Sequence, residues 1–176
     1  MIRFRFLFSI VLFLGCCFSC NRDHSEMSIL KEYLTSDKNT HHLQRITYSV
    51  DLFRLGYDNP VPEKQLDSLR QATDAYLVFL KSHHVTDKTV RQRQQEVIKP
   101  VTQFRQRLMD LRMRLDAFRV VHMQLDSLSQ AGNKVDIHQL ERRERALRRS
   151  ITTRELIRHT IKMLQQVTRA IKRLGS

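Results

Sequence analysis

The residues best suited to chemistry in this 176-residue chain are three cysteines, eight histidines and an arginine-rich stretch near the C-terminus. Cys17 and Cys20 have the Cys-x-x-Cys spacing that redox pairs and half zinc sites use. No second cysteine pair follows, no alternation of strand and helix patterns surrounds this spacing, and it lies within an apolar stretch. The pattern therefore does not favour redox or zinc chemistry.

The histidines are arranged poorly for binding a metal. His41–His42 and His83–His84 are adjacent pairs, and adjacent side chains on a helix point about 100° apart. The His-Glu-x-x-His and Glu-x-x-His spacings of metal sites are missing from the sequence. His122 falls on an apolar helical stripe, where we expect a partly buried polar side chain that sets the packing register. The sequence thus predicts neither a metal nor a cofactor.

Motifs of known catalytic sites are also missing. The chain has only four glycines, too few for a phosphate-cradling loop, and it contains no Gly-x-Ser-x-Gly motif. No pair of carboxylates stands among apolar residues, and the serines and threonines have no evident base partner. We therefore expect a protein that is not an enzyme.

The arginine-rich stretch is the most distinctive candidate for binding. Lys and Arg exceed Asp and Glu by 13, and residues 141–176 hold 11 basic and 3 acidic residues. The candidate anion- or partner-binding residues are Arg142, Arg143, Arg145, Arg148 and Arg149. Guanidinium groups bind phosphate and carboxylate with two parallel hydrogen bonds. The alternative is a solvated helix face balanced by Glu141 and Glu144, and the sequence leaves both interpretations open.

Composition favours long helices as the elements that position these residues. Hydrophobic residues make up 41% of the chain, while four glycines and three prolines are too few for the turns of a sheet protein. We expect an all-α fold, an antiparallel bundle of about three long amphipathic helices with coiled-coil-like packing. One or two shorter helices should precede it, the first near residues 29–34.

Apolar residues at spacings of three and four place the individual helices. The first pattern runs over residues 43–57, and the next runs from Pro62 to His83, with Asp87 as the N-cap of a further helix. The clearest pattern covers residues 97–125, and Pro100 predicts a kink or a helix start within it. A last helix should run from Asp136 to Leu174, although polar residues interrupt its stripe between 148 and 154.

The N-terminal segment has the pattern of an export signal. Arg3 and Arg5 precede thirteen uncharged residues, Phe6 to Phe18. At ~1.5 Å per residue this stretch spans roughly 20 Å, short of the ~30 Å hydrocarbon core of a bilayer. Its length suits the apolar region of a secretory signal, and the sequence turns polar directly after Cys20.

The end of this segment resembles the lipobox of bacterial lipoproteins, in which small residues precede a cysteine. Ser19–Cys20 fits this pattern, and Gly15–Cys16 is the competing match. The resemblance covers residues 1–20 only. It implies cleavage before Cys20 and acylation of its sulfur, which divides the chain into a signal peptide (1–19), a lipidated tether (20–28) and a helical domain (29–176).

These observations predict a lipid-anchored protein of the cell envelope, with the outer membrane as its expected location. Its basic helical face should bind another envelope protein or anionic lipid headgroups. The alternative is a polyanion-binding module for lipopolysaccharide, a cell-wall polymer or nucleic acid. Export disfavours nucleic acid as the partner, and the sequence does not predict the oligomeric state.

Overall fold

The computed structural model describes residues 26–51, 60–131 and 134–174, and within these ranges the chain is all-α, as predicted. Residues 26–35 form a first helix, and one isolated bridge between Pro60 and Thr152 is the only strand-like pairing in the described part. The further helices are α2 (Asp37–Asp51), α3 (Glu63–Ser82), α4 (Lys88–Ala131), α5 (Lys134–Ser150) and α6 (Thr153–Lys172). The predicted stripe residues Phe53 and Tyr57 lie outside the described residues.

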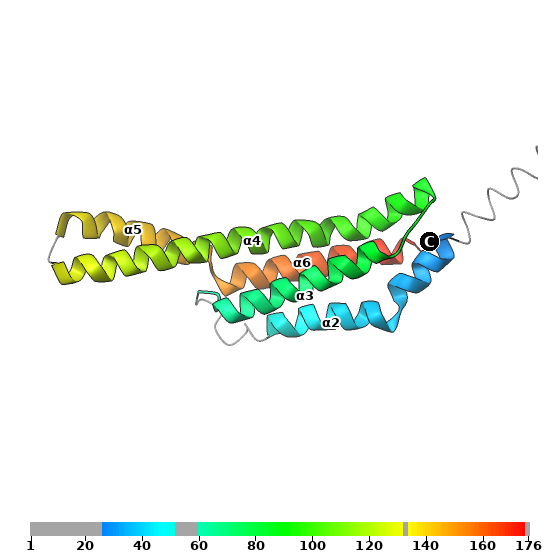
Figure 1. The fold of residues 1–176 in the computed structure, drawn as a ribbon, viewed down its shortest axis with the longest axis horizontal. Coiled ribbons are helices and arrows are strands. Elements are labelled where there is room, and N and C mark those ends of the chain that lie inside the picture. The colour runs from blue at the N-terminus through cyan, green and yellow to red at the C-terminus, as the bar shows by residue number, and fades with distance from the viewer. Residues whose placement is uncertain (1–25, 52–59, 132–133, 175–176) are drawn as a thin grey trace, which may run out of the picture.

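The helices lie side by side along one long axis (Figure 1). α3 packs against α2 and α4, and α6 packs against α4 and, more lightly, α2. α4 has 44 residues and is therefore roughly 65 Å long. Its C-terminal part continues beyond α3 and α6 and pairs with α5 (Figure 1). We call this projecting helix pair, residues 117–131 and 134–150, the arm.

The hydrophobic core joins the helices of the body in one continuous cluster. The inward stripe of α3 includes Leu66, Leu69 and Leu80, all buried. Phe104 and Leu108 of α4 are equally enclosed, at 2% and 1% exposure. Burying one such side chain contributes about 1.5–3 kcal/mol, so apolar packing supplies most of the stability of the body.

Polar side chains fix the corner where α3 turns into α4. The buried Gln94 amide donates to the carbonyl oxygens of Leu80 and His83, at 3.0 and 2.8 Å. These bonds satisfy carbonyls that the end of α3 leaves without a helical partner. Asp87 accepts a hydrogen bond from the Val90 N–H at 2.8 Å, which confirms the predicted N-cap of α4.

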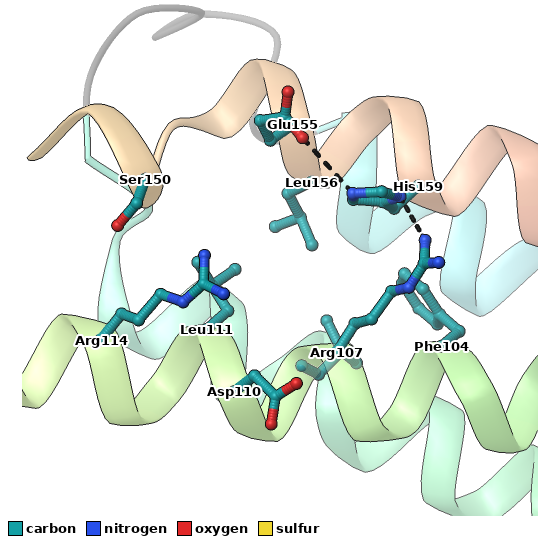
Figure 2. Close-up of a pocket in the computed structure, with 10 residues that line it drawn as sticks. Phe104, Arg107, Asp110, Leu111, Arg114, Ser150, Glu155, Leu156 and His159 are labelled. Atoms are coloured by element: carbon teal, nitrogen blue, oxygen red, sulfur yellow. Dashed lines mark hydrogen bonds and ion pairs between the residues drawn. The ribbon is translucent and has the colours of Figure 1, made fainter. Parts of the chain in front are cut away.

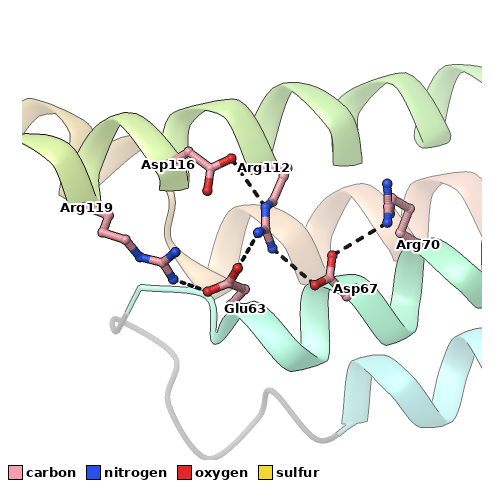
Figure 3. Close-up of polar contacts among 6 residues, drawn as sticks. All are labelled: Glu63, Asp67, Arg70, Arg112, Asp116 and Arg119. Carbon is pink, nitrogen blue, oxygen red and sulfur yellow. Dashed lines mark hydrogen bonds and ion pairs between the residues drawn. The ribbon is translucent and has the colours of Figure 1, made fainter.

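An ion-pair network centred on Arg112 fastens α4 to the start of α3 (Figure 3). Its guanidinium contacts Glu63, Asp67 at 3.1 Å and Asp116 at 3.4 Å. Arg119 also binds Glu63, and hydrogen bonds from Arg119 and then Arg112 hold the pKa of that carboxyl below its ordinary value. One arginine that links three carboxylates sets the register between two helices, but these side chains are partly exposed, so each pair adds little stability.

The prediction of one continuous last helix from Asp136 to Leu174 is wrong. The helix is interrupted between α5 and α6. There Thr152 is extended (φ −74°, ψ 143°), and the Val61 N–H donates to the Ile151 carbonyl at 3.1 Å. Ile151 and Ile157 are both buried. At 100° per residue an unbroken helix would turn them about 120° apart, so the break allows both to reach the core. The break coincides with the polar interruption of the stripe at 148–154.

Pro100 does not start a helix. It lies inside α4, which begins at Lys88, and its ring is buried among the helices. A proline here removes one backbone hydrogen bond, and the surrounding apolar contacts of Val97, Val101 and Phe104 hold the helix in place across it.

Candidate functional site

The five predicted arginines all lie on α5, on the outer side of the arm. α5 turns Ile137, Leu140 and Leu147 toward α4, where each is partly buried. The side chains that point away from this contact are exposed; they are Arg142, Arg143, Arg145, Arg148 and Arg149. The helix thus has an apolar seam against α4 and a basic face toward solvent, which we call the arginine face.

The acids expected to balance the arginine face do so only in part. Glu141 pairs with Arg145, whose Nε also donates to the Glu141 carbonyl at 3.2 Å. Glu144 instead turns toward α4, where its side chain is 18% exposed and lies 3.6 Å from Nδ1 of His122. No ion pair joins Glu144 to any of the five arginines among the described residues. The arginine face therefore has less compensating charge than the sequence suggests.

His122 is not the partly buried seam residue that the sequence predicts. Its side chain is 57% exposed, and the neighbouring Val121 is buried instead, at 1% exposure. Beyond the ends of α3 and α6, α4 packs against α5 (Figure 1). The buried side of α4 in the arm is therefore set by the position of α5, and it includes Val121 instead of His122.

The predicted lipidation site precedes the first residue that the structure describes. Cys20 and its competitor Cys16 lie outside the described residues. In the described ranges, no helix has the length and apolar content needed to cross a membrane. Within the same ranges, no group of three or more His, Cys, Asp or Glu residues is placed to hold a metal ion. His42 stacks on Tyr76 and Phe79 as part of the aromatic packing around α3.

A cleft that the sequence analysis missed lies where α5 ends and α6 begins against α4 (Figure 2). Its volume is about 380 Å³. Phe104 and Leu108 of α4 and Leu156 of α6 form its apolar floor. Arg107 and Arg114 extend from α4 at its two ends (Figure 2). The cleft forms where the helix is interrupted at Thr152. The prediction of one continuous last helix therefore gave no indication of it.

His159 links the two walls of the cleft. Its Nδ1 accepts a hydrogen bond from Arg107, and its Nε2 lies 3.3 Å from the Glu155 carboxylate (Figure 2). An imidazole that accepts at Nδ1 and donates at Nε2 is neutral. Burial, and then the charge of Arg107, lower the pKa of His159, which favours this neutral form.

We expect His159 to titrate below its ordinary pKa of 6.5. Arg107→Gln should raise the pKa only partly, because burial is the larger cause. Since the unfolded chain binds the proton first, the folded state should lose stability as the pH falls from 6.5 to the folded-state pKa. A proton NMR titration of the imidazole measures both values; a wild-type pKa at or above 6.5 would show that the assigned contacts are wrong.

Comparison of the chain with protein-family models, with curated proteins and with solved structures finds no match.

Proposed function

We propose that this protein is a lipid-anchored lipoprotein of the cell envelope, at the outer membrane, and that it acts without catalysis by binding an acidic partner through the arginine face. The lipid anchor rests on the lipobox-like sequence at Cys20. The binding role rests on one observation above all, the exposure of five arginines on a projecting arm. Guanidinium groups in this position can bind carboxylates or phosphates bidentately.

The position of the arm supports a partner that stands away from the anchoring membrane. The described chain begins at Glu26, at the end of the molecule opposite the tip of the arm (Figure 1). Five residues separate Glu26 from Cys20, and an extended chain covers at most ~3.6 Å per residue. The anchor therefore lies near one end of a molecule whose longest helix alone is roughly 65 Å. An acidic envelope protein is the partner that this separation favours over the headgroups of the anchoring bilayer.

We propose that the helical bundle is the rigid scaffold of the protein, with about three long helices in antiparallel, coiled-coil-like packing. The body and the arm share α4. α5 is a surface helix supported by a single neighbour, α4, and is therefore held by few apolar contacts. Because α4 continues into the core of the body, it would keep the arginine face at a fixed distance from the tether.

A polyanion such as lipopolysaccharide or a cell-wall polymer is the second candidate, favoured by the incomplete neutralisation of the arginine face. The two candidates differ in their dependence on salt. Binding to a polyanion releases many counterions and should weaken steeply as salt rises. Binding to a protein through a packed contact should weaken less, because buried pairs are screened less than exposed ones.

Replacing Arg142, Arg145 and Arg149 together with glutamine should reduce the association of the unlipidated mature chain with anionic vesicles. This variant removes three positive charges from one flank of α5. Each charge contributes about 1 kcal/mol to the binding free energy at an anionic surface. Co-sedimentation with phosphatidylglycerol vesicles measures the change. These vesicles serve as an anionic probe for the arginine face.

The matched control removes the same charge elsewhere. Lys31, Lys64 and Lys81 are exposed on the body, and their joint replacement with glutamine also lowers the net charge by three. The control should retain most of the vesicle binding. Equal losses in the two variants would indicate a response to net charge alone, and no loss in the arginine variant would favour a merely solvated face.

A further inference from the structure

The cleft between α4 and α6 has an apolar floor and cationic ends. Phe104, Leu108 and Leu156 are nearly inaccessible to solvent. In Figure 2, Arg114 stands at one end of the cleft and Arg107 at the other, with Leu111 and Leu156 between them. Volumes of about 300–1,000 Å³ are typical of small-molecule sites, and this cleft has about 380 Å³.

The carboxylates of the cleft are already engaged. Glu155 accepts a hydrogen bond from Arg158 and contacts Nε2 of His159 at 3.3 Å. Asp110 accepts a hydrogen bond from the Gln106 amide at 3.1 Å. Arg158 offsets the charge of Glu155, whereas the neutral Gln106 amide leaves the charge of Asp110 uncompensated.

Neither guanidinium group of the cleft is paired with a carboxylate among the residues that the structure describes. Arg107 donates to an imidazole that is neutral in this geometry, so its positive charge is uncompensated by that bond. Arg114 has no hydrogen bond or ion pair among the residues that the structure describes. The first turn of α6 lines the same cleft, and the N-terminal end of a helix carries partial positive charge. These three positive features outweigh the single uncompensated carboxylate of Asp110, and the cleft therefore favours an anion.

We propose that this cleft binds a small organic anion, an oxyanion head on a short apolar body. Arg107 and Arg114 bind the phosphate or carboxylate head, and the leucine and phenylalanine floor receives the apolar part. The site is separate from the arginine face, because it lies on α4 and α6 at the base of the arm. Occupation of the cleft would also bridge α4 to the first turn of α6.

Isothermal titration calorimetry of the mature protein with hexyl phosphate tests this proposal. Inorganic phosphate, hexanoate and hexanol are titrated separately. Inorganic phosphate lacks the apolar body, hexanoate replaces the phosphate head with a carboxylate, and hexanol lacks the charge. We expect hexyl phosphate and hexanoate to bind more tightly than inorganic phosphate and hexanol. Inorganic phosphate can bind only the arginines, and hexanol can contact only the apolar floor. Binding of inorganic phosphate as tight as that of hexyl phosphate, or no binding of either amphiphile, would overturn the proposal.

Arginine variants test whether hexyl phosphate binds in the cleft. A charge-assisted hydrogen bond contributes about tenfold or more to affinity, so Arg107→Gln and Arg114→Gln should each weaken hexyl phosphate binding by about ten- to a hundredfold. Arg105→Gln is the matched control, since Arg105 lies on the same helix but pairs with Asp74 of α3. Perturbation of the His159 imidazole resonances by hexyl phosphate gives a second readout. Equal effects of all three variants, or unchanged His159 resonances, would contradict the assignment.

Discussion

Replacing Cys20 with alanine is expected to release the protein from the membrane fraction and to abolish its labelling by fatty acid. Each buried methylene of an acyl chain contributes about 0.8 kcal/mol, and two chains are needed for stable attachment. Metabolic labelling with a palmitate analogue, followed by fractionation of the cells, measures both effects.

The neighbouring cysteines are the controls for this experiment. Cys17→Ala should change neither the labelling nor the fractionation, and Cys16→Ala should behave in the same way if cleavage occurs before Cys20. Loss of the label in the Cys16 variant alone would move the lipid to the competing position. Full membrane binding without label, in both wild type and Cys20→Ala, would refute the lipoprotein assignment.

Leu108→Ala is expected to destabilise the fold by about 2–5 kcal/mol, because a leucine-sized cavity in a packed core loses both transfer energy and contacts. Leu108 is 1% exposed at the centre of α4, where it also forms the floor of the cleft. A change of this size would lower the melting temperature by about 2–4 °C per kcal/mol. Urea denaturation followed by circular dichroism at 222 nm provides the measurement.

The adjacent Met109 provides the matched control. It lies on the same turn of α4 but is 39% exposed, so Met109→Ala should change the stability by about 0.5 kcal/mol or less. Similar losses in the two variants would mean that the buried face of α4 is assigned incorrectly. The comparison also separates core packing from helix propensity, since alanine favours the helix at both positions.

The sequence predicts the helical class and most of the buried stripes, because three- and four-residue spacing follows directly from helix geometry. Leu66, Leu69, Phe104 and Leu108 are buried as their spacing requires. The pattern does not determine where a helix ends when no glycine or proline marks the end. The break at Thr152 follows from tertiary pairing with the Pro60–Val61 segment, which lies about 90 residues earlier in the sequence.

The arginine face was predictable from the sequence and the cleft was not. Five arginines within eight residues of a helix must leave several exposed, since one face alone can pack against a neighbour. The cleft requires Arg107 and Arg114 to face Glu155 and His159 across two helices. No local spacing encodes such a pairing. His159 itself has no distinguishing neighbours in the sequence, and only the packing of α6 on α4 brings it to Arg107.

Site-specific photo-cross-linking in intact cells tests the central claim most directly. The cross-linking amino acid is placed at Ala146, exposed among the arginines of α5, or at Val78, 70% exposed on α3. Binding through the arginine face predicts a discrete protein adduct from position 146 alone, which disappears when Arg142, Arg145 and Arg149 are replaced by glutamine. No adduct from position 146, or one that persists without these arginines, would contradict it.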